Sequence, residues 1–183
     1  FFNPRGHTMS LDALGAGKNA PEEFNVVIEI AAGGPPVKYE VDKETGLLMV
    51  DRFMNVAMHY PCNYGYVPKT LYDDGDPVDV LVLTPYPVLA GSIIKCRAVG
   101  YLNTEDEKGM DAKILAVPVD KVSNNYYTDM QDLKDAPERI NTALKHFHEH
   151  YKDLEKGKWV KVTGWHNAAE AKVEIAKSIA AYK

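Results

Sequence analysis

Apolar and polar positions along the first two thirds of the chain follow the patterns of β-strands. Residues 37–42 alternate between apolar and polar side chains, and the turn sequence KETG leads into an apolar segment over 47–53, so the two segments predict a β-hairpin. Further strands are expected over 24–31 and onward from Val78, Ser92, Ala112 and Lys158. Residues 59–68, rich in Tyr, Pro and Gly, are interpreted as a structured loop.

Two helices are expected near the C-terminus. Pro137 suits the first turn of a helix, the apolar side chains after it recur at steps of four and three, and Gly157 ends the pattern. This stripe consists of Ile140, Leu144, Phe147, Tyr151 and Leu154. Asn167 and Glu170 resemble a capping box that begins the second helix. Its inner face is expected to carry Ala171, Ile175 and Ile179.

Short strands followed by late helices predict a mainly β domain in which a small closed β-barrel carries helices on its outside. The 183 residues contain no internal repeat, low-complexity segment or long linker, and this length suits one domain with a sizeable core. Residues 1–8 lack the layout of a secretion signal, and we expect them to be a remnant of cloning. Met9 is then the native start, and residues 9–183 form the domain.

Composition and charge narrow the classes of function. With 45% apolar and 26% charged residues the chain is expected to be ordered, and a formal net charge of −5 argues against general affinity for nucleic acid or anionic membrane. No apolar run approaches the roughly 20 residues that a membrane helix needs. Cys62 and Cys96 form no C-x-x-C motif and no metal-ligand spacing, which is typical of reduced, partly buried thiols in a cytoplasmic protein.

A dense acidic stretch runs directly into the strand that is expected from Val78 onward. Gly75 and Pro77 restrict the backbone between its aspartates, which are Asp73, Asp74, Asp76 and Asp79. At an effective dielectric near 20, like charges about 4 Å apart repel by about 4 kcal/mol, so we expect the stretch to hold cations. Carboxylates are the ligands that Mg²⁺ prefers, often together with a phosphate.

Two other interpretations explain less of this acidic stretch. An EF-hand counted from Asp74 would require a glycine at Asp79 and a glutamate at Pro85. A solvated loop rich in Asx turns accounts for the first aspartate but not for the whole set. A second acidic group supports metal binding, because Asp106 and Asp111 lie at the end of one strand and the start of the next and could complete a site for several ions.

Cationic and aromatic side chains elsewhere suit a substrate that carries phosphate. Arg52 lies in a mostly apolar strand segment and is expected to have an anionic partner, while Lys38 and Glu40 project from the polar side of their strand. A phenol can donate a hydrogen bond to phosphate, although packing competes with this role for Tyr151 on the apolar stripe. The aromatic and lysine candidates are Tyr60, Tyr64, Tyr66, Tyr151 and Lys152.

Together these segments carry a resemblance to a known family. The sequence resembles the bacterial family I soluble inorganic pyrophosphatases from about Lys18 to the end of the second helix. The motifs that follow the order and spacing of this family are VIEI, VKYEVDKETG, VDRFM, YPCNYGYVP, DGDPVDVLV, DAKILAVP and HYKDLEKGKWVKV. DGDPVD is the family's signature, whereas none of the other motifs would decide the matter alone.

The resemblance implies an OB-like five-stranded barrel with helices outside that cleaves pyrophosphate to two orthophosphates with Mg²⁺, in a homohexamer; Mn²⁺ or Zn²⁺ stay open as substitutes. Asp76 would be the base that acts on the nucleophilic water. The metal ions would be bound by Asp74, Asp79, Asp106 and Asp111. The phosphate oxygens would be held by Lys38, Arg52, Tyr64, Tyr151 and Lys152. Supporting positions are Glu29, Glu40, Tyr60 and Lys113.

Two other functions compete with this one. A nucleic-acid-binding OB module would present basic grooves with exposed stacking aromatics, but this chain is acidic and its tyrosines lie beside carboxylates. A metal-dependent phosphohydrolase of another substrate, such as a nucleotide, is nearer, although the chain has no G-x-x-x-x-G-K loop.

His146 and His150 could chelate zinc, but no third ligand is visible, and we favour packing or a subunit contact.

Overall fold

The computed structural model describes residues 11–183, so the expectations for residues 1–8 and Met9 lie outside the described part of the chain. The strands are β1 (Phe24–Ile30), β2 (Val37–Val41), β3 (Leu48–Phe53), β4 (Asn63–Tyr66), β5 (Asp79–Val82), β6 (Ile93–Asp106), β7 (Gly109–Pro118) and β8 (Val160–Asn167). The helices are α1 (Asp120–Ser123), α2 (Glu138–His150) and α3 (Ala168–Ala181), with short 3₁₀ helices η1 (Leu11–Ala13) and η2 (Leu133–Asp135). Within the described residues, no helix has the length and apolar character to cross a membrane.

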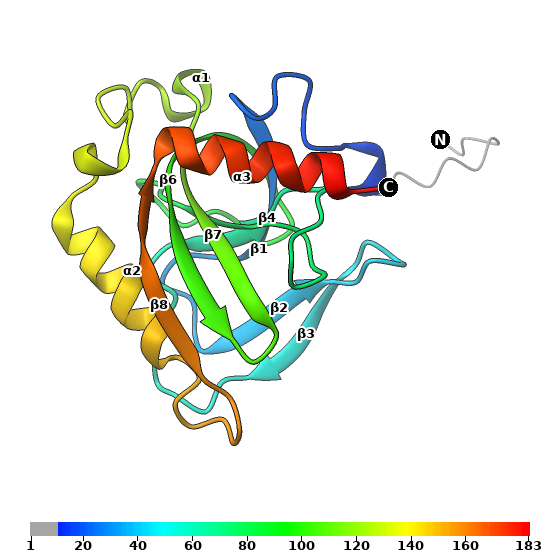
Figure 1. Ribbon diagram of the computed structural model, residues 1–183, viewed down its shortest axis with the longest axis vertical. Coiled ribbons are helices and arrows are strands. Elements are labelled where there is room, and N and C mark those ends of the chain that lie inside the picture. The colour runs from blue at the N-terminus through cyan, green and yellow to red at the C-terminus, as the bar shows by residue number, and fades with distance from the viewer. Residues whose placement is uncertain (1–10) are drawn as a thin grey trace.

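Five strands close on themselves to form the barrel. Hydrogen-bonded neighbours follow the order β1-β4-β5-β7-β6, and β1 also pairs with β6, which closes the ring. β5 and β7 pair in parallel, whereas the other neighbours in the ring are antiparallel. β8 extends the sheet beyond β6, and β2 and β3 form the predicted hairpin. The prediction of a five-stranded closed barrel with flanking helices is therefore confirmed (Figure 1).

Both faces of the barrel sheet are buried, in two separate apolar clusters. Successive residues of β5 and β7 belong to different clusters, because side chains on a strand alternate between its faces. The first cluster includes Val80 and Ile114 together with Ala171 and Ile175 of α3. The second includes Leu81 and Leu115 together with Leu144 and Phe147 of α2. Burial on two faces explains why the strands that begin near Val78 and Ala112 are continuous apolar runs in the sequence.

The segment interpreted as a structured loop contains strand β4, and this part of the prediction was wrong. β4 pairs with β1 on one side and with β5 on the other, so the YPCNYGYVP motif helps to close the ring. A Cβ atom on Gly65 would overlap the carbonyl oxygen of Val27 in β1, so the two backbones approach too closely for a side chain. A four-residue strand built around a glycine lacks the alternating pattern by which strands are recognised.

Helix α2 ends earlier than its apolar stripe predicts. It begins one residue after Pro137 and ends at His150, and Leu154 is 64% exposed. Beyond the helix the backbone tightens into turns in which Glu155 N–H donates to the carbonyl of Lys152. This change of direction brings the side chains of Lys152 and Glu155 toward the ends of the β2–β3 and β6–β7 hairpins, where both make ion pairs.

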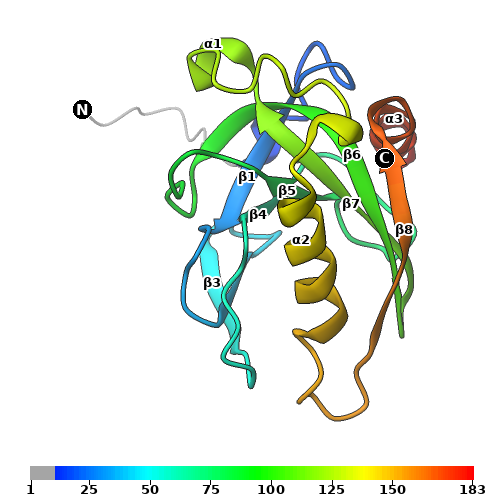
Figure 2. The same cartoon turned by 90° about the vertical axis from the view of Figure 1, so that its left-hand side faces the viewer.

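Helix α3 begins at the predicted capping box. The side chain of Asn167 accepts the N–H of Glu170, whose carboxylate accepts the N–H of Asn167 in return. Ala171 and Ile175 are fully buried, and Ile179 packs against the same apolar cluster. The predicted inner face is confirmed, and Figure 2 shows the helix lying beside the end of β8.

Candidate active site

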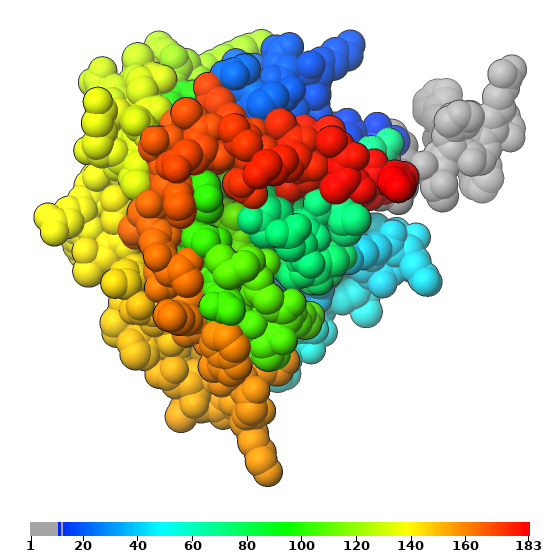
Figure 3. Space-filling model, viewed as in Figure 1, coloured from blue at the N-terminus to red at the C-terminus, as the bar shows by residue number. Residues whose placement is uncertain are grey.

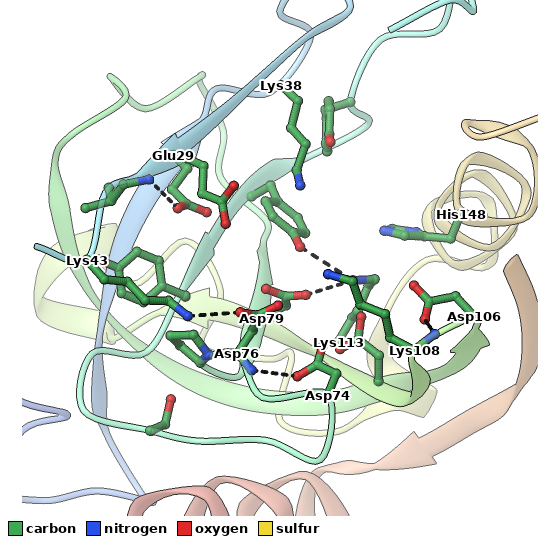
Figure 4. Close-up of a pocket in the computed structure, with 18 of the residues that line it drawn as sticks. Glu29, Lys38, Lys43, Asp74, Asp76, Asp79, Asp106, Lys108, Lys113 and His148 are labelled. Atoms are coloured by element: carbon green, nitrogen blue, oxygen red, sulfur yellow. Dashed lines mark hydrogen bonds and ion pairs between the residues drawn. The ribbon is translucent and has the colours of Figure 1, made fainter. Parts of the chain in front are cut away.

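A pocket of about 300 Å³ collects side chains from elements that lie far apart in the sequence. Its walls come from β1, the β2–β3 hairpin, the loop between β4 and β5, the β6–β7 hairpin and the end of α2. Figure 4 shows its acidic and basic side chains pointing toward one another. All the site residues predicted from the sequence line this pocket: Glu29, Lys38, Glu40, Arg52, Tyr60, Tyr64, Asp74, Asp76, Asp79, Asp106, Asp111, Lys113, Tyr151 and Lys152.

The acidic stretch after Tyr72 forms a compact turn. Asp74 Oδ1 accepts the backbone N–H of Asp76 at 3.0 Å, which is an Asx turn, and the N–H of Tyr72 donates to the carbonyl of Asp76 at 2.8 Å. Gly75 adopts φ 85°, a conformation that glycine reaches without steric cost. The turn therefore keeps Asp74 and Asp76 together at the pocket, whereas Asp73 is exposed outside it.

Lys113 joins two of the predicted metal ligands. Its ammonium lies 2.8 Å from Asp79 Oδ2 and 2.8 Å from Asp111 Oδ2, and only 5% of the residue is exposed. The parallel pairing of β5 with β7 places Asp79 opposite Lys113, and Asp111 lies two residues earlier on the same face of β7. The barrel thereby brings together acids that are far apart in the sequence.

One buried ammonium does not balance the carboxylates around it. Burial raises the pKa of Asp111 to about 7, and the neighbouring Asp79 adds to this rise while Lys113 opposes it. Burial, followed by the nearby carboxylates, also raises the pKa of Asp74. Although burial alone lowers the pKa of Lys113, the two carboxylates outweigh burial, so the lysine stays charged. Around Lys113, this part of the pocket therefore has more acidic than basic side chains.

Asp106 has different partners from the other predicted metal ligands. Its Oδ1 accepts the backbone N–H of Lys108 at 2.9 Å, which stabilises the turn between β6 and β7. Its Oδ2 lies 3.1 Å from the ammonium of Lys152. Asp106 thus links this hairpin to the segment after α2, and it brings a predicted metal ligand next to a predicted phosphate-binding lysine.

Two cations of the β2–β3 hairpin, Lys38 and Arg52, lie on paired positions of the two strands. Lys38 is the cross-strand partner of Arg52, and Asp51 lies 2.7 Å from Arg52 Nη1 and 3.7 Å from Lys38 Nζ. The predicted anionic partner of Arg52 is Glu155, which accepts hydrogen bonds from Nε at 3.0 Å and from Nη2 at 3.3 Å. Such a bidentate pair fixes the plane of the guanidinium group.

Aromatic rings form another wall of the pocket. Phe147 stacks on Tyr151 with ring centroids 5.2 Å apart, and Tyr60 lies 4.7 Å from Phe147 and 5.6 Å from Tyr64. Burial raises the pKa of both Tyr60 and Tyr64 above the ordinary value, so their phenols keep their protons and can donate hydrogen bonds. Tyr151 packs against the core and also lines the pocket, so the two interpretations of this residue are compatible.

Comparison with known proteins assigns the chain to a family. A family model described as inorganic pyrophosphatase matches residues 26–183. The chain belongs to the inorganic pyrophosphatase family. An inorganic pyrophosphatase of Yersinia pestis is 59% identical over 170 residues, which cover 93% of this chain and 97% of that protein. The resemblance seen in the motifs is thus confirmed.

Solved structures agree with the family. A structure of an inorganic pyrophosphatase from Coxiella burnetii is 54% identical and superposes with a TM-score of 0.89, covering 92% of this chain and 99% of that one. A structure of an inorganic pyrophosphatase from Thermus thermophilus is 44% identical, with a TM-score of 0.87 over 92% of this chain and 96% of that one. The OB-like barrel is therefore the fold of the family.

Pyrophosphatases of this family depend on metal ions in general. Among residues 11–183, no three carboxylate, imidazole or thiol side chains lie close enough together to hold an ion in their present positions. The donor set nevertheless fits a hard cation, because it consists of carboxylates. Asp79 and Asp111 also share a single ammonium, that of Lys113, so two carboxylates face one cation and a divalent ion is favoured there.

Glu29 is a buried carboxyl group whose pKa lies far above its ordinary value. Its Oε1 accepts the backbone N–H of Val41 at 2.8 Å and so ties β1 to the β2–β3 hairpin. Burial raises the pKa of Glu29 from 4.5 to about 8, and the hydrogen bond from Val41 offsets only part of the rise. The folded chain therefore keeps a proton on Glu29 under conditions in which the unfolded chain loses it.

We expect Glu29 to make the metal-free protein less stable as the pH rises from about 4.5 to about 8. Its contribution is fully present below the unfolded pKa and is lost as the pH rises through the folded pKa. One linked proton lowers the free energy of unfolding by about 1.4 kcal/mol per pH unit. Denaturant unfolding of wild type and Glu29→Gln in a chelator measures this slope. The slope of the free energy of unfolding against pH should be smaller in Glu29→Gln by that amount. Glu44→Gln, a change at an exposed residue, is the control and should match wild type. An unchanged slope in Glu29→Gln would contradict the raised pKa of Glu29.

Two acids beside the pocket were not predicted individually. Asp51 lies within the motif VDRFM, next to Arg52, and Glu155 lies within HYKDLEKGKWVKV. Each forms an ion pair with Arg52. The expectation that Arg52 needs an anion was confirmed, but the sequence alone could not select the partner, because Glu155 reaches it only through the turn after α2.

Two further pocket residues were also missed. Lys43, in the turn between β2 and β3, donates to Asp76 Oδ1 at 2.9 Å. His148 is 2% exposed, and its Nδ1 donates to the carbonyl of Leu144 at 2.7 Å. Burial, together with Lys113, lowers the pKa of His148 to about 3, so it stays neutral. Its place one helical turn after Leu144 was the signal that could have located it.

Proposed function

We propose that this chain hydrolyses pyrophosphate to two orthophosphates, with Mg²⁺ as its metal. The observation that carries the proposal is a pocket in which carboxylates meet cationic side chains, in a chain that belongs to the inorganic pyrophosphatase family. An anionic substrate suits the cations, and a divalent ion suits the carboxylates.

Aspartate side chains would hold the metal, namely Asp74, Asp79, Asp106 and Asp111. When bound, Mg²⁺ would offset phosphate charge and lower the pKa of a coordinated water. Lys113 would hold Asp79 and Asp111 in position through its two ion pairs. Because its ammonium already lies between these carboxylates, it would limit their repulsion at every stage of the reaction.

Asp76 would accept the proton of the attacking water. A new bond then forms between the water oxygen and one phosphorus as the bridging P–O bond breaks, and the second orthophosphate leaves. The side chain of Asp76 is 43% exposed, so water can reach it, and the Asx turn with Asp74 fixes its backbone at the pocket. Phosphoryl transfer requires mainly positioning and charge stabilisation, which such a turn supplies.

Cations and phenols would hold the phosphate oxygens. Arg52 presents a planar fork that can bind two oxygens, whereas Lys38 beside it acts as a point charge. Tyr64 is a protonated donor because burial raises its pKa. Tyr151 and Lys152 would contribute from the end of α2.

The direct test is phosphate release from pyrophosphate with and without Mg²⁺. We expect release that requires the metal. Profiling nucleotides and other phosphate esters in the same assay separates a pyrophosphatase from a phosphohydrolase of another substrate, and a gel shift tests the nucleic-acid-binding alternative. Release no faster than from nucleoside triphosphates would contradict the proposed substrate.

Mg²⁺ should also raise the melting temperature. An ion that binds only the folded chain, present at 100 times its dissociation constant, adds about 2.7 kcal/mol to the free energy of unfolding. For a chain of this size that corresponds to an increase of about 5–10 °C. Thermal melts in Mg²⁺ and in a chelator measure the difference. Equal melting temperatures in the two solutions would argue against the site.

We further propose a cytoplasmic homohexamer in which α2 takes part in a subunit interface. A shallow groove beside α2 contains His59, Arg139 and His146, and the exposed rings of His146 and His150 lie 4.6 Å apart. Sedimentation at neutral and at acid pH tests the assembly, because histidine side chains gain charge between these pH values. A monomer at neutral pH would contradict it.

A further inference from the structure

Helix α3 is tied to the acidic turn at two points. The backbone N–H of Leu71 donates to the carbonyl of Ser178 at 2.9 Å, and the phenol of Tyr72 donates to Glu174 Oε2 at 3.0 Å. We call these four residues the α3 strap. In Figure 3 the blue-green segment that precedes β5 lies directly against the red end of α3.

Bonds within the loop set its shape but leave its outer part dependent on the strap. At the base, Thr70 Oγ1 donates to the carbonyl of Val67 at 2.6 Å and accepts the N–H of Val78 at 3.0 Å. The Asx turn closes the tip. Between base and tip, the α3 strap links residues 71 and 72 to a different element of the fold. On the other side, within the described residues, the tip is held by the exposed ion pair between Lys43 and Asp76, and such pairs contribute about 0–1 kcal/mol.

Helix α3 is a firm anchor for this purpose. Its buried face and its capping box fix it on the barrel. The last four carbonyl groups of a helix have no intrahelical partner. Ser178 supplies one of them, since Tyr182 N–H donates to Ile179 instead, and Leu71 satisfies it. Ser178 is 2% exposed, so water does not readily replace the loop there.

The bond between Tyr72 and Glu174 is shielded and carries charge. The side chain of Glu174 is 19% exposed, and Tyr72 packs against the first apolar cluster. Burial, with Glu174 as the next cause, raises the pKa of Tyr72, so the phenol keeps the proton that it donates. Hydrogen bonds to an ionised acceptor are about twice as strong as neutral ones.

We infer that Tyr72 and Glu174 are positioning residues of the hydrolytic site, which hold the turn of Asp74 and Asp76 at the depth where metal and water are bound. The inference rests on the proposed function. The C-terminal helix, which contributes none of the predicted site residues, thereby sets the geometry of the acids. The ring of Tyr72 supplies packing, and its hydroxyl supplies the positioning.

Tyr72→Phe and Glu174→Met test the strap. Each removes one partner of a hydrogen bond to a charged group, and we expect kcat and Mg²⁺ affinity to fall by about tenfold. KM for pyrophosphate should change little, because the phosphate-binding side chains belong to other elements. Glu174→Gln keeps an acceptor oxygen and should recover most of the loss. Lys177→Ala removes the other partner of Glu174 and is the matched control, expected to behave as wild type.

The double variant separates positioning from general stabilisation. If the two residues act through one bond, Tyr72→Phe adds little to Glu174→Met in kcat and in calorimetric Mg²⁺ affinity. Additive losses, or a lower melting temperature with unchanged Mg²⁺ affinity, would overturn the inference. Amide hydrogen exchange over residues 73–78 gives a test independent of activity. A wild-type chain that fails to hydrolyse pyrophosphate would overturn the proposed function. Faster amide exchange in Tyr72→Phe would still support the α3 strap in that case. Unchanged exchange in this variant would overturn the α3 strap.

Discussion

Asp76→Asn is expected to lower kcat for pyrophosphate by about 10²–10⁴-fold, the range that general base catalysis contributes. Asparagine has nearly the same shape but cannot take up a proton. The hydrogen bond from the backbone N–H of residue 76 to Asp74 does not involve the substituted side chain, so the turn should persist. The lost ion pair with Lys43 is exposed and contributes little. The effect should therefore appear in turnover and not in stability.

A matched control lies in the same turn. Asp73 is exposed and lies outside the pocket, so Asp73→Asn removes an equal charge without touching the reaction. Steady-state phosphate release, at saturating Mg²⁺ and pyrophosphate, compares the two variants. Turnover by Asp76→Asn close to that of wild type, or an equal loss in Asp73→Asn, would refute the role of Asp76 as the base.

Asp79→Asn is expected to weaken Mg²⁺ binding by about 30-fold to a few thousand-fold, because removing one partner of a close charge pair, here the carboxylate that would face the ion, costs about 2–5 kcal/mol. Asp79 is the first residue of β5, and its carboxylate shares the ammonium of Lys113 with Asp111. Turnover at fixed Mg²⁺ should fall with the lost affinity. Isothermal titration calorimetry measures the binding directly.

Without metal, the same substitution should not lower the stability of the folded chain. In wild type one ammonium faces two half-buried carboxylates, and in Asp79→Asn it faces one, so the charges of Lys113 and Asp111 balance. We therefore expect the variant in a chelator to be at least as stable as wild type, while the increase in melting temperature on adding Mg²⁺ shrinks. Unchanged calorimetric affinity would show that Asp79 is not a ligand.

Local patterns predicted much of the fold and the contents of the pocket. The alternation over residues 37–42 and the capping box at Asn167 mark elements whose formation depends on neighbouring residues. The density of acids in DGDPVD signalled a need for cations, because repulsion at that spacing is large on any fold. Family resemblance then placed lysines, arginine and tyrosines in the same pocket, and the structure brings them there.

The remaining features depend on contacts between distant segments. Gly65 belongs to a strand only because β1 passes close to it. Lys113 lies between Asp79 and Asp111 because β5 pairs in parallel with β7, a register that no local pattern specifies. The apolar stripe continued to Leu154, whereas the backbone turned after His150 and left that leucine exposed.

The pairing of β1 with β6 has a consequence for how the protein folds. Phe24 lies opposite Cys96, so the ring closes only when segments separated by four intervening strands meet. Loop-closure entropy makes such non-local pairings slow to form. The walls of the pocket are attached to this ring. A chain that has formed its hairpins but has not yet paired β1 with β6 therefore has no pocket for a substrate. Catalytic competence should consequently return late in refolding, in step with the final closure rather than with the first secondary structure.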